Sequence, residues 1–324
     1  MSKINQTDYQ EYLELINQGN SQRTCCTILG LNRSTMQNYL KRVAEDEDSE
    51  SIDLKHMTHG ELLGTSKIEK QQPLTKRKPT ILVIADTQAK SEESLEYLLW
   101  IGKYIADKKP DVIIHIGDHF DLPSLSSYDK GTAKIEGKRL YKDIQAGVTG
   151  FEFLNLELLK YKDYNPRKVF CLGNHEERLD RYVNEHPELQ GTLGTDKLPF
   201  GKYGWEVHPF LKPVEIEGIF FVHFLANPMS GKPYSGTAAN ILSKVGRSFV
   251  VGHKQCLDIA IRPTIDGKQQ IGIVNGACYD HLEGYKGYQG NNHFRGITVL
   301  HECSDGFAVP MFVSLDYMKE KYYG

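Results

Sequence analysis

The segment DVIIHIGDHFD, residues 111–121, sets the pattern for most of this chain. A run of β-branched apolar residues leads directly into Gly117 and Asp118, so a buried strand is predicted to end at a carboxylate. Two other runs have the same form, ILVIAD at 81–86 and VFCLGN at 169–174. Near-continuous apolar runs that alternate with helices are typical of a largely parallel sheet covered on both faces. Because ligands bind at the carboxyl ends of such strands, polar side chains there are candidate site residues.

The periodicity of the rest of the chain predicts helices between these strands and a strand-rich region after about residue 203. The expected helices span 94–109, 137–162, 176–186 and 236–245, and the further strands span 218–223, 248–252, 257–264, 269–275, 296–302 and 307–314.

The composition narrows the class of protein. The chain has 324 residues, and its net charge of −3 produces no global field that favours nucleic acid or membrane. No run reaches the roughly 18 apolar residues of a membrane span, and the polar start MSKINQTDYQ lacks the apolar core of a signal peptide. The six cysteines form no CxxC pair. We therefore expect a cytoplasmic protein without a membrane partner, in a reducing compartment, whose thiols are packing residues.

Residues 8–43 are expected to form three helices. Ser21 is a candidate N-cap of the second helix, Gly30 is its terminating glycine, and Asn32 is the candidate cap of the third. The stretch GNSQRTCCTILGLNRSTMQNYLKR, residues 19–42, resembles a helix-turn-helix of the resolvase or transposase type. This resemblance implies DNA as a partner and a possible homodimer on paired half-sites. The candidate DNA-binding side chains are Arg33, Ser34, Thr35, Gln37, Asn38, Lys41 and Arg42.

A different reading of residues 1–43 stays open. The segment holds five basic and three acidic residues, so it is only mildly basic. A small three-helix adaptor that binds protein would have the same pattern.

Residues 44–79 have the composition of a linker. The run 44–53 holds six acids in ten residues, and a basic, proline-containing stretch follows. Blocks of like charge with few large apolar groups do not fold alone. The sequence therefore predicts three parts: a helix-turn-helix domain at 1–43, a charged linker at 44–79 and a large domain at 80–324.

Five short polar patches lie at strand ends of the large domain. They combine carboxylate, amide and imidazole groups, a mixture that suits two hard or borderline divalent metals held close together. The patches are Asp86-Thr-Gln88, Gly117-Asp118-His-Phe-Asp121, Gly173-Asn174-His175-Glu176, His223 and Gly252-His253-Lys-Gln255.

In their order and type, these patches resemble the calcineurin-like metallophosphoesterase superfamily. The pattern of that superfamily is D-x-H, GDxxD, GNH[DE], a lone His and GHxH. The resemblance covers residues 80–324 and implies an α/β fold. In this fold a two-sheet sandwich is flanked by helices (α/β/β/α), here preceded by the small all-α domain. It also implies a metal-dependent phosphoric ester hydrolase in which a water activated by two metals attacks phosphorus.

The resemblance assigns roles to individual residues. Asp118 bridges both metals and Asp86 binds the first metal. His175 is the catalytic histidine, which stabilises the transition state or protonates the leaving oxygen. The ligands that complete the second metal are Asn174, His223 and His253.

Two positions depart from the superfamily pattern. Gln88 stands where D-x-H has histidine, and Gln255 stands where GHxH has its second histidine. Both positions serve the first metal, so two imidazoles have become two neutral, harder amide oxygens. We expect Mn²⁺, or Mg²⁺, to be preferred over Zn²⁺ or Fe²⁺ at this site, or the first metal to bind weakly. A decayed, inactive site is the alternative.

Other polar residues near the patches leave two interpretations each. Asp121 either supports the ligand shell or caps a loop. His119 is a candidate substrate contact, whereas His115 lies within an apolar strand and is expected to be a core histidine. Arg178 either reaches a phosphate oxygen or forms a surface ion pair with Glu177 or a neighbouring acid.

Three functions follow for the whole chain. The first is a phosphodiesterase, a nuclease that acts on DNA and is tethered to it by residues 1–43. The second is a phosphomonoesterase that acts on proteins or nucleotides, because GNHEER at 173–178 resembles the Ser/Thr phosphatase branch of the superfamily. The third is a DNA-binding regulator with an inert phosphoesterase domain.

Overall fold

The computed structural model describes residues 6–17, 20–40, 77–127, 129–284 and 286–323. The chain divides into two compact units, Met1–Pro73 and Leu74–Gly324, which are taken here one at a time. Most of the segment interpreted as a linker lies outside the described residues. In the described ranges, every helix is too short or too polar to cross a membrane.

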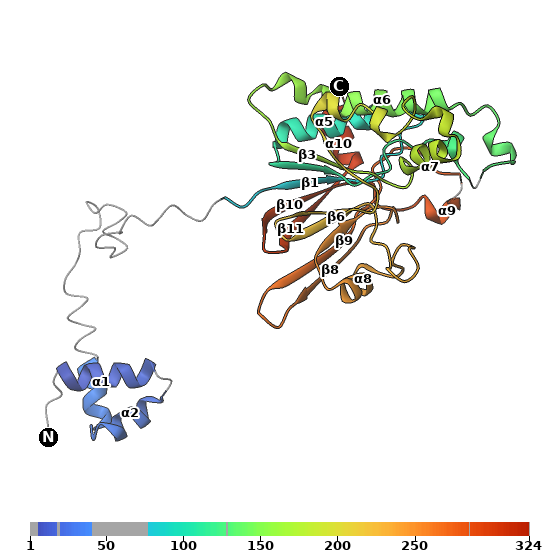
Figure 1. Cartoon of the computed structure of the whole chain (residues 1–324). Helices are drawn as coiled ribbons and strands as arrows, with labels where there is room; N and C mark the ends of the chain where they lie inside the picture. Colours follow the sequence, from blue (N-terminus) through green and yellow to red (C-terminus); the bar gives the residue numbers. More distant parts are fainter. Residues whose placement is uncertain (1–5, 18–19, 41–76, 128, 285, 324) are drawn as a thin grey trace. The chain divides into compact units, whose positions relative to one another are not determined.

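The first unit is built from helices around a small core. It contains α1 (Gln6–Asn17), α2 (Gln22–Ile28) and a further helical segment over 33–40 (Figure 1). Adjacent cysteines on α2 point into the core, as the sequence predicts. The buried side chains of this core are Tyr12, Cys25, Cys26 and Met36.

The predicted boundary signals of these helices are confirmed. Ser21 Oγ accepts a hydrogen bond from the Thr24 N–H at 3.2 Å, and Asn32 Oδ1 accepts one from the Ser34 N–H at 2.9 Å. Gly30 has a φ of 63°, a left-handed conformation that glycine adopts without steric cost and that ends α2. Local side-chain chemistry therefore fixes where these helices begin and end.

The second unit is a sandwich of two sheets (Figure 1). The first sheet has the order β11-β10-β1-β2-β3-β4, and the second has the order β5-β6-β7-β9-β8. The strands of the first sheet are β1 (Ile81–Ile84), β2 (Val112–His115), β3 (Arg167–Cys171), β4 (Glu206–His208), β10 (Gly296–Ser304) and β11 (Phe307–Ser314). Those of the second are β5 (Val214–Ile216), β6 (Ile219–Val222), β7 (Phe249–Val251), β8 (Asp258–Pro263) and β9 (Gln269–Val274).

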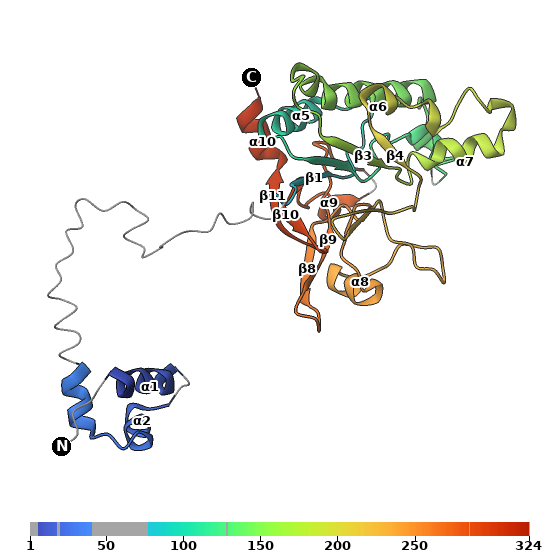
Figure 2. The same ribbon diagram turned by 60° about the vertical axis from the view of Figure 1, so that its left-hand side comes forward.

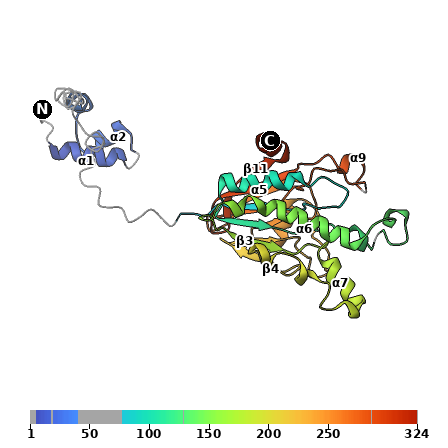
Figure 3. The same ribbon diagram turned by 90° about the horizontal axis from the view of Figure 1, so that it is seen from above.

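Helices cover the outer faces of both sheets. On the first sheet, α5 (Glu96–Lys108) and α6 (Leu140–Leu156) run side by side (Figure 3), and α10 (Leu315–Tyr322) packs beside α5. On the second sheet, α8 (Ala238–Val245) lies against the outer face (Figure 2). The predicted α/β/β/α order of layers is confirmed.

Alternation along β1 shows why this strand is apolar on both sides. Leu82 and Ile84 pack against the helices, whereas Ile81 and Val83 pack between the two sheets. A strand with two buried faces needs an unbroken apolar run, which is what ILVI provides.

Several elements were not expected from the sequence. They include β4, β5, α10, the short helix α9 (Gly287–Gly290) and a set of 3₁₀ turns, whereas α7 (Glu177–Glu185) lies where a helix was predicted. The expectation that every thiol is a packing residue is wrong for Cys256, which is exposed. The 3₁₀ turns span Pro123–Leu125, Ala133–Ile135, Leu158–Lys160, Pro187–Leu189, Thr195–Lys197 and Gly201–Tyr203.

Candidate active site

The parallel strands of both sheets end at one edge of the sandwich. Strands β1, β2 and β3 are parallel neighbours in the first sheet, and β6 and β7 are parallel neighbours in the second. The chain leaves each of them through a short polar turn, so the polar groups of two sheets meet there. The residues brought to this edge are Asp86, Asp118, Asn174, His223 and His253.

One half of the site is a tight cluster of possible cation ligands. One donor atom each from Asp118, His223 and His253 lies within 4.8 Å of the other two. His223 Nε2 lies 3.2 Å from Asp118 Oδ2 and 2.9 Å from Asn174 Oδ1. The other ring nitrogen, Nδ1, donates to the Ile116 carbonyl at 2.9 Å, which leaves Nε2 to face the cluster.

The other half carries buried polar atoms that lack partners. Asp86 Oδ2 accepts a hydrogen bond from the His253 N–H at 3.0 Å. Asp86 Oδ1 and both amide atoms of Gln88 are buried and have no partner among the described residues. Gln255 Oε1 accepts a hydrogen bond from the Tyr279 hydroxyl at 3.0 Å. Buried oxygens without donors, next to two carboxylates, fit a divalent cation.

Burial and neighbouring charges shift the pKa values of both carboxylates in the site. Burial disfavours the charged form of Asp118, but His175 and His223 outweigh it, so the pKa of Asp118 lies below its ordinary value. Burial works against a charge on His223 as well, yet Asp118 raises the pKa of that imidazole to about 9. Burial, with the Asp118 carboxylate nearby, raises the pKa of Asp86 to about 7. A cation bound near Asp86 and Asp118 would favour the charged form of both carboxylates.

Backbone strain is concentrated at the same place. Of the eleven non-glycine residues with positive φ in the described ranges, five belong to the site. Such conformations cost about 1–3 kcal/mol each and persist only where the surrounding structure holds them. The five are Asp86 (49°), Gln88 (43°), Asp118 (56°), His253 (66°) and Gln255 (55°).

Glycines in the motifs let the carboxylates approach the backbone. A Cβ at Gly173 would lie 2.2 Å from Asp118 Oδ1, and one at Gly252 would lie 2.5 Å from Asp86 Oδ2. Both distances are shorter than any stable contact, so larger residues would displace the carboxylates. The glycine before each ligand is therefore a packing requirement of the site.

His175 lies between two carboxylates. Its Nδ1 is 2.8 Å from Asp121 Oδ1, and its Nε2 is 3.6 Å from Asp118 Oδ2. Burial disfavours the charged imidazole, but Asp118 and Asp121 raise the pKa of His175 above its ordinary value. Asp121 is thus placed to orient this ring, and Lys90 Nζ lies 3.6 Å from its other oxygen.

Glu176 was not among the predicted site residues, although it closes the GNHE motif. Its buried carboxylate accepts four backbone N–H groups, from Asp118 (3.0 Å), His119 (2.7 Å), Phe120 (2.8 Å) and Gly173 (2.8 Å). It therefore ties the turn that carries Asp118 to the turn that carries Asn174. A carboxylate directly before a helix in a glycine-containing turn was the available signal.

The two candidate substrate contacts, His119 and Arg178, have hydrogen-bond partners within the protein. His119 is buried, with Nδ1 2.8 Å from Thr87 Oγ1 and Nε2 2.9 Å from the Gly147 carbonyl, so it is a core residue. His115 is a satisfied core histidine, as expected. Arg178 forms no ion pair with Glu177 in the described residues. It donates to the Asp121 carbonyl at 2.7 Å and supports that turn.

The candidate DNA-binding residues lie in the first unit. Arg33, Ser34, Gln37 and Asn38 are exposed on the segment 33–40, and Thr35 is partly buried. Lys41 and Arg42 lie outside the described residues.

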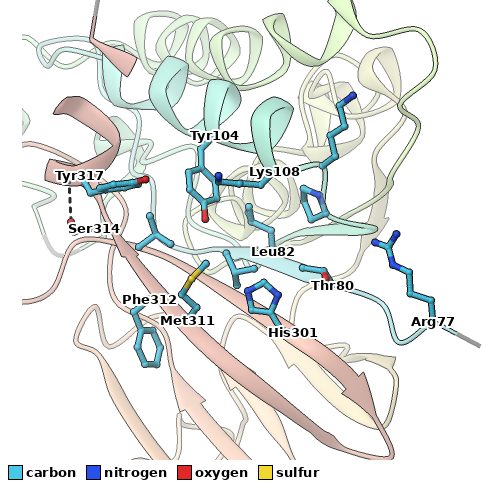
Figure 4. A pocket seen from close by; sticks show the side chains of 14 residues that line it. Arg77, Thr80, Leu82, Tyr104, Lys108, His301, Met311, Phe312, Ser314 and Tyr317 are labelled. Atoms are coloured by element: carbon cyan, nitrogen blue, oxygen red, sulfur yellow. Dashed lines mark hydrogen bonds between the residues drawn. The ribbon is translucent and has the colours of Figure 1, made fainter. Parts of the chain in front are cut away.

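A separate cavity of about 550 Å³ lies at the opposite end of β1 (Figure 4). Tyr104 and Lys108 of α5 border it on the helix side. Two of its basic side chains already have carboxylate partners, because Arg77 pairs with Asp111 at 3.1 Å and Lys108 with Asp107 at 3.3 Å. The unpartnered ligand groups described above are at the other end of the strand, so the candidate active site is placed there.

A family model and two phage proteins are similar to this chain. The family model described as calcineurin-like phosphoesterase matches residues 79–254, just over half of the chain. The Gene 54 proteins of Mycobacterium phage L5 and Mycobacterium phage D29 are each 29% identical to it over 178 residues, 53% of this chain and 68% of the relative.

Two solved structures align at low similarity. Yfce, a phosphoesterase from E. coli, aligns with a TM-score of 0.33 and 12% identity, over 73% of this chain and 99% of its own. The nuclease MPE of Pseudomonas putida aligns with a TM-score of 0.31 and 11% identity, over 71% of this chain and 87% of its own. On the family match, the chain belongs to the calcineurin-like phosphoesterase family and is a phosphoric ester hydrolase.

Proposed function

We propose that this chain is a metal-dependent phosphodiesterase that acts on DNA, with two divalent cations at the strand ends and Mn²⁺ as the preferred ion. The observation that carries the metal centre is the cluster of buried Asp118, buried His223 and partly buried His253 beside the unpartnered oxygens of Asp86 and Gln88.

The residues of each half would hold one cation. Asp118 would serve both, Asp86 with Gln88 and Gln255 would serve the first, and the second would be completed by Asn174, His223 and His253. Divalent cations bound there supply positive charge for the phosphoryl oxygens and lower the pKa of water.

His175 supplies the proton chemistry of the reaction. The Asp121 contact fixes the direction of its ring, and its Nε2 faces the Asp118 side of the site. A histidine held in this way can donate a proton to the leaving oxygen or stabilise charge on the phosphoryl group. The fixed ring avoids an ordering cost during the reaction.

The amides of Gln88 and Gln255 support the preference for Mn²⁺ or Mg²⁺. An amide oxygen is a harder ligand than an imidazole nitrogen, so it favours hard cations over Zn²⁺. Titration of the metal-free protein with each ion tests this. If Zn²⁺ proves the best activator, the proposed preference is wrong.

DNA as the substrate is supported by the first unit. Exposed Arg33, Gln37 and Asn38 on one short helix have the side-chain types that contact phosphates and base edges. A tethered binding unit would raise the effective concentration of DNA near the catalytic unit. We also propose that the chain can bind paired half-sites as a homodimer.

The first test compares hydrolysis of bis(p-nitrophenyl) phosphate and p-nitrophenyl phosphate with Mn²⁺. We expect turnover of the bis-ester. In Asp118→Asn the turnover rate should fall at least about a hundredfold, since cations held by Asp118 would lower the free energy of the transition state by several kcal/mol. Turnover of the mono-ester alone would favour a phosphomonoesterase. No turnover of either, with normal DNA binding, would favour a regulator with an inert domain.

The second test measures DNA binding by the full chain. Replacing Arg33, Gln37 and Asn38 together by alanine should weaken DNA binding at least about tenfold and leave bis-ester turnover unchanged. Arg23→Ala, an equal loss of charge on an exposed position of α2, is the matched control. Equal affinity of the triple variant and the wild type would count against DNA binding through this helix.

A further inference from the structure

The chain segment after β9 reaches into the Asp86 half of the site. Lys286 Nζ donates a hydrogen bond to Tyr279 Oη at 2.8 Å, and Tyr279 Oη donates to Gln255 Oε1 at 3.0 Å. The next residues form α9, which lies at the same end of the sandwich as α7 (Figure 1). A positive charge is thus connected by two hydrogen bonds to an amide that departs from the family pattern.

Packing fixes this connection in place. Tyr279 is fully buried, and its ring stacks on His281 with centroids 4.5 Å apart. Lys286 Nζ and Arg295 Cζ lie 5.4 Å and 5.2 Å from the Tyr279 ring centroid. The phenol cannot turn away without breaking these contacts, so it holds the amide oxygen of Gln255 in one direction.

The Lys286 charge is not neutralised by the acid next to it. Glu283 is paired with Lys90 and accepts a hydrogen bond from His281 Nε2 at 2.8 Å. Within the ranges that the structure describes, Lys286 forms no ion pair with a carboxylate. Lys286 Nζ therefore lies within about 6 Å of Gln255 Oε1, the upper limit set by the two hydrogen bonds.

We propose that Lys286, acting through Tyr279 on Gln255, makes the Asp86 half the weaker of two cation positions. The inference rests on the proposed metal centre and adds a positioning role for two residues outside the family motifs. A fixed positive charge repels a divalent cation, and a shared hydrogen bond reduces the electron density that the Gln255 oxygen offers. In the described residues, no lysine is linked through a single side chain to Asp118, His223 or His253. Lys90 reaches Asp118 only through Asp121 and His175.

Binding of Mn²⁺ to the metal-free full chain, without substrate, tests the proposal. Calorimetry and the spin-resonance signal of free Mn²⁺ would give the affinity of each position. We expect two affinities that differ at least about tenfold, and Lys286→Met should tighten the weaker one by a similar factor while leaving the tighter one unchanged. Tyr279→Phe, which keeps the ring and removes the hydroxyl, should act in the same direction.

Lys268→Met is the matched control, because it removes an equal charge from an exposed position in the β8–β9 turn. Two equal affinities in the wild type, or an unchanged weaker affinity in both the Lys286 and the Tyr279 variants, would overturn the inference but leave the metal centre standing. No Mn²⁺ binding at any position would overturn both.

Discussion

Glu176→Gln is the substitution for which the structure makes the sharpest prediction. The side chain is fully buried, and its two oxygens accept four backbone N–H groups. Glutamine has nearly the same shape, but one of its two terminal groups is an N–H donor. The change therefore tests the hydrogen bonds of Glu176 with little change in packing.

The magnitude follows from which bonds are lost. If the amide nitrogen takes the position of Oε1, it faces the N–H groups of His119 and Phe120, and if it takes that of Oε2, it faces those of Asp118 and Gly173. In either case two buried N–H groups lose their charged acceptor, and each loss lowers the free energy of unfolding by about 1.5–3 kcal/mol.

Part of this loss is offset. Burial, followed by repulsion from Asp118, raises the pKa of Glu176, so the native protein carries a cost for the charge that glutamine removes. We expect a net loss of about 3 kcal/mol in the free energy of unfolding, which corresponds to roughly 6–12 °C in melting temperature for a unit of this size.

Tryptophan fluorescence during denaturation measures the effect in the right unit, because both tryptophans, Trp100 and Trp205, are buried there. Glu177→Gln is the matched control. Its side chain accepts no hydrogen bond from a described residue, so its cost should stay below about 0.5 kcal/mol. A loss below about 1 kcal/mol for Glu176→Gln would refute the role assigned to its four hydrogen bonds.

Two further substitutions test the ligand geometry. Gly252→Ala places a Cβ 2.5 Å from Asp86 Oδ2, so we expect the affinity for Mn²⁺, measured by calorimetry, to fall at least about tenfold. Gly201→Ala is the control, because its Cβ meets no atom within 4 Å and should leave the affinity for Mn²⁺ unchanged. Equal affinities would show that the carboxylate is not held by this contact. Replacing Gln88 and Gln255 together by histidine should move the preferred activator from Mn²⁺ toward Zn²⁺ in a metal titration, since imidazole is the softer ligand. If the double variant is activated by the metals in the same order as the wild type, the interpretation that the two amides set the metal preference is wrong.

The sequence by itself determined the layers of the fold and the polar groups that follow its parallel strands. Runs such as ILVI are apolar on both faces because both faces are buried, and this local requirement is visible without the fold. The caps Ser21 and Asn32 act on the next turn of the same helix, so their signals are local as well. The missed strands β4 and β5 have three residues each and contain Glu206, His208 and Glu215, so they lack the apolar run that marks the equally short β7.

Only the tertiary structure decided which of these polar residues face the candidate site and which are covered by other elements. His119 lies next to Asp118 in sequence, but α6 covers it and the Gly147 carbonyl takes its second nitrogen. Asp86 and Asp118, which have left-handed φ values, place their carboxylates against Gly252 and Gly173, which are distant in the sequence. Contacts between residues more than a hundred positions apart, such as His253 with Asp86, are set by how two sheets meet, and no local pattern in the sequence encodes that meeting.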